Sequence, residues 1–93
     1  MEFEWDEAKR RANLAKHRID FVDAKEIWQG DVLEVRSSQD RHGEARELAY
    51  GLVRGRVIAV VFTRRGDRRR VISARRARHH ERQAYQEAFG RGA

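Results

Sequence analysis

The chain has no cysteine and no proline, and hydrophobic residues make up only 40% of it. The absence of cysteine excludes a disulfide framework, a thiolate nucleophile and a zinc ribbon. The longest apolar run, Val57 to Phe62, falls far short of the ~20 residues of a membrane-spanning helix. Because the start Met1 to Asp6 is acidic and unlike a secretion signal, we expect a cytoplasmic protein.

A length of 93 residues fits one domain, residues 1–93, with a small core. There is no Ser/Gly-rich tract and no repeat, and the seven glycines stand singly where elements would change. We therefore expect one unit without a linker.

Positive charge is concentrated in the second half of the chain. Residues 1–53 hold 9 basic and 12 acidic residues, whereas residues 54–93 hold 12 basic and 3 acidic ones. Of the 21 basic residues 18 are arginine, whose planar guanidinium binds phosphate or carboxylate through two hydrogen bonds. Five arginines between Arg64 and Arg70 repel one another, which predicts a polyanionic partner.

Two helices are expected in the first third of the chain. The first, Asp6 to His17, has Asp6 as N-cap and carries apolar residues at helical spacing, namely Ala8, Ala12, Ala15 and Ile19. The second starts after Asp20 as N-cap, continues through Trp28 and has Gly30 as C-cap. The two should form a helical hairpin.

After Gly30 the apolar period changes to two, which predicts strands near residues 32–35 and 47–52, joined by a polar turn at residues 37–43. Residues 57–63 form the one continuous apolar run, which should be the central strand, and residues 70–75 a fourth strand.

A last helix is expected from about Ala77 to Phe89, ending before Gly90. The predicted fold class is therefore α+β, with two N-terminal helices, a four-stranded antiparallel sheet and a C-terminal helix.

Two groups of strand residues could carry chemistry. His42, Glu44 and Arg46 share one face and could supply a base, an acid and a phosphate clamp, or could simply be a solvated strand end. Arg65 shares a face with Thr63, and Arg75 with Ser73, so that cross-strand neighbours could present both guanidiniums to one site. The alternative for the second group is a solubilising outer face.

Other side chains have a structural and a functional interpretation. Lys9, Asn13 and Lys16 or His17 form a polar stripe on the first helix, which is typical of a solvated face. The aromatic residues are expected mainly in the core, namely Trp5, Phe21, Trp28, Tyr50 and Phe62. Tyr85, one turn from Glu81, could flank the sheet arginines or be a packed helix aromatic.

No metal site or cofactor is expected. His79 and His80 are adjacent on a helix, point about 100° apart and lack companions at ligand spacing.

In their order along the chain, several short motifs resemble the BrnT family of type II toxins over about residues 3–85. The motifs are Trp5-Asp6-Glu7-Ala8-Lys9, Asn13, Lys16-His17, Phe21, His42-x-Glu44-x-Arg46, Gly55-Arg56, Val60-Val61-Phe62-Thr63-Arg64-Arg65, Arg70-Val71-Ile72-Ser73-Ala74-Arg75-x-Ala77, Glu81-Arg82 and Tyr85. One departure is Arg18, where the family usually has glycine after the Lys-His pair. Glycine suits a left-handed helix end, so Arg18 predicts a strained or differently shaped turn next to His17.

The resemblance implies a RelE-like fold, an endoribonuclease activity that stops translation, and neutralisation by a BrnA-type antitoxin that binds DNA. RNA cleavage without a metal would proceed by attack of the ribose 2′-hydroxyl on the adjacent phosphate, with arginines stabilising the negative charge that develops. Arg46, Arg65 and Arg75 are the candidates for this role.

For the general base His17 ranks first and His42 second, because an imidazole has an ordinary pKa of about 6.5. Glu81 is a further catalytic candidate, although the surrounding arginines oppose the higher pKa that a base needs. The candidate RNA contacts are Lys9, Lys16, His42, Arg64, Arg68 and Tyr85. Two other functions remain open: a non-catalytic nucleic-acid-binding module, and an interaction domain whose basic face binds an acidic partner.

Overall fold

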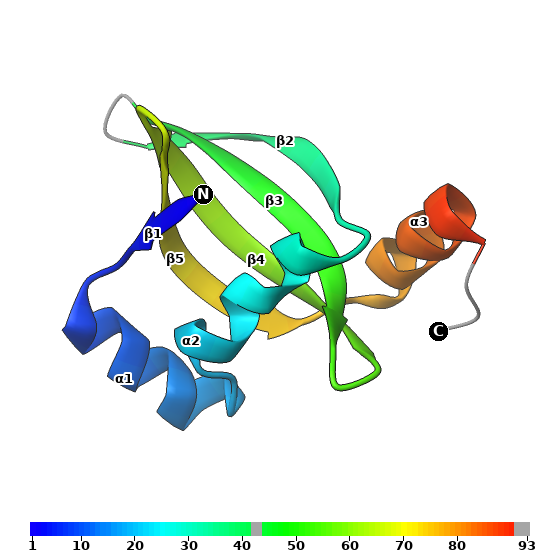
Figure 1. Cartoon of the computed structure of the whole chain (residues 1–93), viewed down its shortest axis with the longest axis horizontal. Coiled ribbons are helices and arrows are strands. Elements are labelled where there is room, and N and C mark those ends of the chain that lie inside the picture. The colour runs from blue at the N-terminus through cyan, green and yellow to red at the C-terminus, as the bar shows by residue number, and fades with distance from the viewer. Residues whose placement is uncertain (42–43, 91–93) are drawn as a thin grey trace.

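The computed structural model describes residues 1–41 and 44–90, without the side chains of residues 37–41 and 44 (Figure 1). Along the chain the elements are β1 (Glu2–Glu4), α1 (Glu7–His17), α2 (Phe21–Ala24), the 3-10 helix η1 (Lys25–Gln29), β2 (Leu33–Arg41), β3 (Glu44–Val53), β4 (Arg56–Arg65), β5 (Arg68–Arg76) and α3 (His79–Phe89). The α+β class is confirmed, but the sheet has five strands rather than four.

The sheet has the order β1-β5-β4-β3-β2, so β4 is the central strand, as the sequence predicts. Strands β2 to β5 pair antiparallel, while β1 pairs parallel to β5 and makes the sheet mixed. Three residues that alternate between acidic and apolar are too short a pattern to predict a strand. Charge pairing supports this one, because the Arg70 guanidinium donates to the Glu4 carboxylate at 2.9 Å.

Helix α1 begins where expected, because the Asp6 carboxylate accepts hydrogen bonds from the backbone N–H groups of Ala8 and Lys9. The face that it buries is not the expected one. The alanines of the predicted apolar stripe are exposed, and Asn13, from the polar stripe, is 7% exposed. The Asn13 side chain is buried because it hydrogen-bonds both backbone groups of Ala74 on β5, with its Nδ2 donating to the carbonyl and its Oδ1 accepting from the N–H.

The second helix also starts as predicted, because the Asp20 carboxylate caps the N–H of Val22. It changes from α to 3-10 after Ala24, and Gly30 is the C-cap, as predicted, in an extended conformation with φ −128°. The 3-10 helix η1 lies against Gly51 of β3, where a Cβ atom on residue 51 would come within 2.5 Å of the Ile27 side chain. Glycine at this position therefore permits the close approach.

Two clusters of buried residues lie on opposite faces of the sheet. The first lies beneath α1, α2 and η1, which cover one face (Figure 1), and contains Phe21, Ile27 and Phe62. The second contains Tyr50 of β3 and Tyr85 of α3, which packs at one end of the other face. Trp5 and Trp28 pack at the edge of the first cluster. The predicted structural role of the aromatic residues is thus confirmed.

Three boundaries differ from the sequence-based expectation. Helix α3 begins at His79, and Ala77 is buried in the connection before it. Strand β2 continues to Arg41 and β3 begins at Glu44, so most of the predicted turn at residues 37–43 is strand, with a register shift between Arg36 and Asp40. Polar strand ends that pair only with each other lack the apolar alternation that predicts a strand.

Candidate functional site

The face of the sheet opposite α1 and α2 is covered by α3 at one end only, and arginines lie along it. Arg46, Arg65 and Arg75 lie on this face. Leu48, two residues after Arg46, packs there, and so does Ala59, which pairs with Arg75 and precedes Arg65 by an even number of residues on β4. We refer to it as the open face.

The strongest polar contact on the open face joins β5 to α3. Nη1 and Nη2 of Arg75 donate to the two carboxylate oxygens of Glu81, at 2.7 and 2.9 Å. The backbone N–H of Arg78 adds a third bond, at 2.7 Å, to Glu81 Oε1. The Arg75 side chain is 20% exposed and that of Glu81 only 3%. Glu81 therefore holds the guanidinium at the surface while its own carboxylate stays buried.

Burial by itself raises the pKa of Glu81, but the Arg75 guanidinium and the Arg78 N–H outweigh that effect and lower the pKa to about 2. A carboxylate that is buried, ionised and saturated with donors is not a general base near neutral pH. Tyr50, next to the pair, has a raised pKa because it is buried and faces the Glu81 carboxylate. Its phenol therefore remains protonated.

The strand register contradicts the expectation that Arg65 and Arg75 are close neighbours. Arg65 pairs with Arg68, Arg75 pairs with Ala59, and a shift between Val61 and Phe62 offsets the ladder. Six residues separate Ala59 from Arg65 on β4, which is about 20 Å at ~3.3 Å per residue. The tight turn at Gly66 fixes this register. The arginines of the open face therefore form a row rather than a single clamp.

Thr63 lies on β4 in the same row and pairs with Arg70. It is 2% exposed, and its Oγ1 has no hydrogen-bond partner among the described residues. Buried hydroxyls are nearly always paired, so an unpaired one between charged neighbours suits a position next to a polar ligand.

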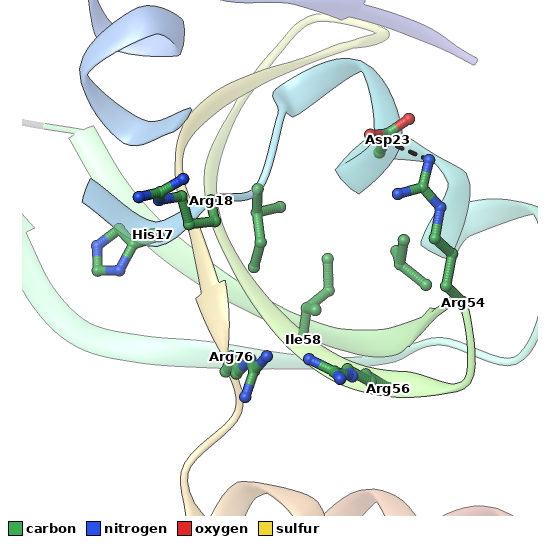
Figure 2. A pocket seen from close by; sticks show the side chains of 9 residues that line it. His17, Arg18, Asp23, Arg54, Arg56, Ile58 and Arg76 are labelled. Carbon is green, nitrogen blue, oxygen red and sulfur yellow. Dashed lines mark ion pairs between the residues drawn. The ribbon is translucent and has the colours of Figure 1, made fainter. Parts of the chain in front are cut away.

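His17 does not join the open face. It lines a hollow of about 360 Å³ on the other side of the sheet, where α1 ends above the hairpin between β3 and β4. Figure 2 shows Arg18, Arg54, Arg56 and Arg76 around Ile58, with His17 at the rim. Ile58 belongs to the cluster beneath the helices, whereas Arg75 contacts α3. His17 and Arg75, both candidate catalytic residues, therefore lie on different faces of the sheet.

Sequence reasoning missed this second basic site. Its arginines come from a helix end, a hairpin and a strand end that are distant in sequence. The sequence did hold a signal, since Arg18 stands at a helix end and Arg54 precedes Gly55. In the structure both residues adopt positive φ, 61° and 52°. Arg18 caps α1 in the left-handed conformation, so the strained form of the predicted turn is correct.

The remaining candidate RNA contacts are dispersed. Lys9 and Lys16 are exposed on α1, on the side of the helices. Arg64 is held by Glu47 and Glu34, at 2.7 and 2.8 Å, and stands over the Phe62 ring.

Arg68 is exposed near Glu2 and Glu4, and His42 lies outside the described residues. Tyr85 is a packed aromatic: it is 1% exposed, and its hydroxyl donates to the Asp31 carbonyl at 3.0 Å. A buried phenol whose hydroxyl is already used cannot stack on a base.

Within residues 1–41 and 44–90, no group of three histidine, aspartate or glutamate side chains gathers that could hold a metal ion. The helices of that part of the chain are also too short or too polar to cross a membrane.

A small α+β domain with a row of arginines on an open sheet face has the features of a phosphate-backbone-binding protein. Residues 5–81 match the family of BrnT ribonuclease toxins of type II toxin-antitoxin systems. The chain therefore belongs to the BrnT family. No curated protein matches it. The family defines a ribonuclease toxin with an RNA substrate and an antitoxin partner.

Proposed function

We propose that the chain is a metal-independent endoribonuclease that cleaves RNA on the open face, stops translation and is neutralised by a BrnA-type antitoxin. The observation that carries this proposal is the Arg75–Glu81 pair, which fixes a guanidinium at the surface of the face that the helices leave uncovered. A preorganised donor of this kind stabilises the charge of a phosphorane-like transition state without reorganisation.

The row of arginines suits one RNA strand lying along the sheet. Arg65 lies next to the β4–β5 turn, about 20 Å from the level of Arg75 along β4 at ~3.3 Å per residue. Arg46 lies on β3 beside Glu47, which pairs with Phe62, so it is about 13 Å from that level. They would hold phosphates several nucleotides away from the one bound by Arg75. Guanidiniums spaced along a strand fix the register of the backbone, and the ordered Arg75 marks the scissile position.

In the proposed reaction the ribose 2′-oxygen attacks the adjacent phosphorus and the bond to the 5′-oxygen breaks. The products are a 2′,3′-cyclic phosphate and a 5′-hydroxyl. The 2′-hydroxyl gives up a proton and the 5′-oxygen gains one. We assign neither transfer to Glu81, which is a positioning residue for Arg75, nor to His17, which lies on the other side of the sheet. Arg41, which precedes His42, pairs with Glu44 at the end of the sheet where Arg65 lies, so we do not assign the transfer at Arg75 to His42 either.

The test is incubation of the purified chain with a labelled single-stranded RNA in EDTA. The parent should produce fragments with cyclic phosphate ends, and Arg75→Ala should lower the rate on the order of 10²-fold or more. Arg36→Gln, which removes an exposed charge from β2, is the matched control and should cleave like the parent.

His17→Ala and His42→Ala separate the two histidines in the same assay. We expect both variants to cleave within about threefold of the parent, because the reaction proposed at Arg75 uses neither histidine. A greater loss for His17→Ala would move the reaction to the hollow. RNA that is bound but left intact, even on translating ribosomes, would favour the non-catalytic binding module instead.

A further inference from the structure

The hollow at the end of α1 is a second basic site, separated from the open face by the sheet. Its cationic side chains come from three places in the fold: Arg18 follows α1, Arg54 and Arg56 form the β3–β4 hairpin, and Arg76 ends β5. Among the described residues that line it, Asp23 is the only acidic one, and it lies 3.8 Å from Arg54. The hollow therefore has a surplus of positive charge that no carboxylate of its own lining balances.

Two of these arginines stand where the backbone favours another residue. Arg18 and Arg54 have φ values of 61° and 52°, and they are the only non-glycine residues of the described chain with positive φ. A residue with a Cβ atom in this conformation costs about 1–2 kcal/mol relative to the right-handed form. Backbone strain of this kind clusters at functional sites, and here both strained residues line the same hollow. The guanidiniums are thus present despite their conformational cost.

The walls of the hollow show which anion fits. Between the arginines lie the apolar side chains of Ile19, Val53 and Ile58, and the one aromatic ring among the described lining residues is that of His17, at the rim. A phosphate backbone would leave these apolar walls unused. An acidic peptide with one apolar side chain would fill the floor and pair its carboxylates with the rim, which is the usual pattern of an apolar core and a charged edge.

The surface continues beyond the hollow along α1. Arg18 also borders a shallow depression that contains Arg11, Leu14 and Ala15. Leu14 is 39% exposed and therefore adds apolar surface between Arg11 and Arg18. An apolar strip between two arginines has the same pattern as the hollow itself, so a bound segment could follow the helix.

We propose that this hollow binds an acidic segment of the antitoxin, with an apolar side chain placed between Ile19, Val53 and Ile58 and with carboxylates on Arg18 and Arg54. The inference requires the antitoxin that the family implies, and it does not depend on the reaction assigned to the open face. The toxin would then be held from the side opposite its RNA.

The test uses two substitutions that remove charge while relieving the backbone. Glycine suits the left-handed end of α1, and asparagine before Gly55 forms a favoured hairpin turn. Arg18→Gly and Arg54→Asn should therefore fold at least as stably as the parent. Each should weaken binding of the purified cognate antitoxin about tenfold, and the double variant about a hundredfold, as measured by titration calorimetry at fixed salt.

Arg36→Gln removes the same single charge on β2 and controls for long-range electrostatics. Antitoxin affinities of the double variant and of Arg36→Gln that agree within about twofold would overturn the proposal. RNA cleavage is measured without antitoxin on the same proteins. If the double variant loses cleavage and keeps its antitoxin affinity, the hollow binds RNA instead. If the parent does not cleave RNA, the ribonuclease proposal fails, while the affinity comparison still decides this one.

Discussion

The Arg75 guanidinium is fixed by Glu81 through two parallel hydrogen bonds of 2.7 and 2.9 Å that connect β5 to α3. Two-pronged pairs of this kind restrict the guanidinium in distance and in plane, which a single contact cannot do. The Glu81 side chain is buried, whereas that of Arg75 is partly exposed. The carboxylate therefore has a structural role, and the guanidinium remains available at the surface. The pair thus couples the fold of α3 to the open face.

Substitution of Glu81 should therefore affect stability and catalysis together. Glu81→Gln keeps the shape but removes the charge that holds Arg75. We expect a loss of roughly 1–3 kcal/mol in the free energy of unfolding, less than for a fully buried pair because Arg75 still reaches solvent. Urea unfolding measures that loss.

The cleavage rate separates positioning from mere destabilisation. A misplaced guanidinium should lower kcat about tenfold or more with little change in KM, at a temperature where the variant is folded. A kcat equal to that of the parent would show that Glu81 does not position Arg75 for catalysis.

The same pair makes stability dependent on pH in acid. The pKa of Glu81 is about 2 in the folded chain and 4.5 ordinarily, so its ionised form stabilises the fold above pH about 4.5. This contribution, roughly 2–3 kcal/mol, should be lost as the pH falls from about 4.5 to about 2. Unfolding free energies of the parent and Glu81→Gln should therefore converge over that interval. A difference that stays constant from pH 6 to pH 2.5 would contradict the lowered pKa.

Local signals predicted much of the fold, because they act within a few residues. The Asp6 and Asp20 caps and the apolar run of β4 were recognisable in this way. The burial of Asn13 could not be predicted in this way. A buried and a solvated asparagine have the same place in a helical pattern, and only the tertiary structure brings the β5 backbone against this one.

Part of the candidate site could also be predicted from local signals, and part could not. Alternation placed Arg75 on a strand face correctly, but its distance from Arg65 depends on a register shift and a two-residue turn that alternation does not specify. The hollow was missed because its residues meet only through tertiary structure, although Arg54 before Gly55 and Arg18 at a helix end were signs of strain.

Asn13 offers a direct test of the contact that fastens α1 to the sheet. Its side chain makes three hydrogen bonds, with the N–H and carbonyl of Ala74 and with the carbonyl of Ile19. Asn13→Ala leaves buried backbone groups unpaired, so we expect a loss of about 2–4 kcal/mol in urea unfolding. Ala12→Ser, an exposed change on the same helix, should stay within about 0.5 kcal/mol. Equal effects of the two substitutions would contradict the role of Asn13.

The row of arginines predicts that some of them contribute to RNA binding and another to the chemical step. Arg65, on β4, and Arg46, on β3, lie toward the end of the sheet away from Arg75, so they should contribute phosphate contacts and little to the chemical step. Arg46→Ala and Arg65→Ala should each weaken binding of a short single-stranded RNA and reduce the slope of log Kd against log salt by about 0.7.

Arg75→Ala should instead lower kcat by on the order of 10²-fold at saturating RNA. Fluorescence anisotropy between about 50 and 200 mM salt measures the slopes, and single-turnover cleavage measures the chemical step. If Arg65→Ala lowers the single-turnover rate as much as Arg75→Ala does, the arginines converge on one phosphate when RNA binds. The sheet would then have to bend, because its present register holds the two residues at opposite ends of the open face.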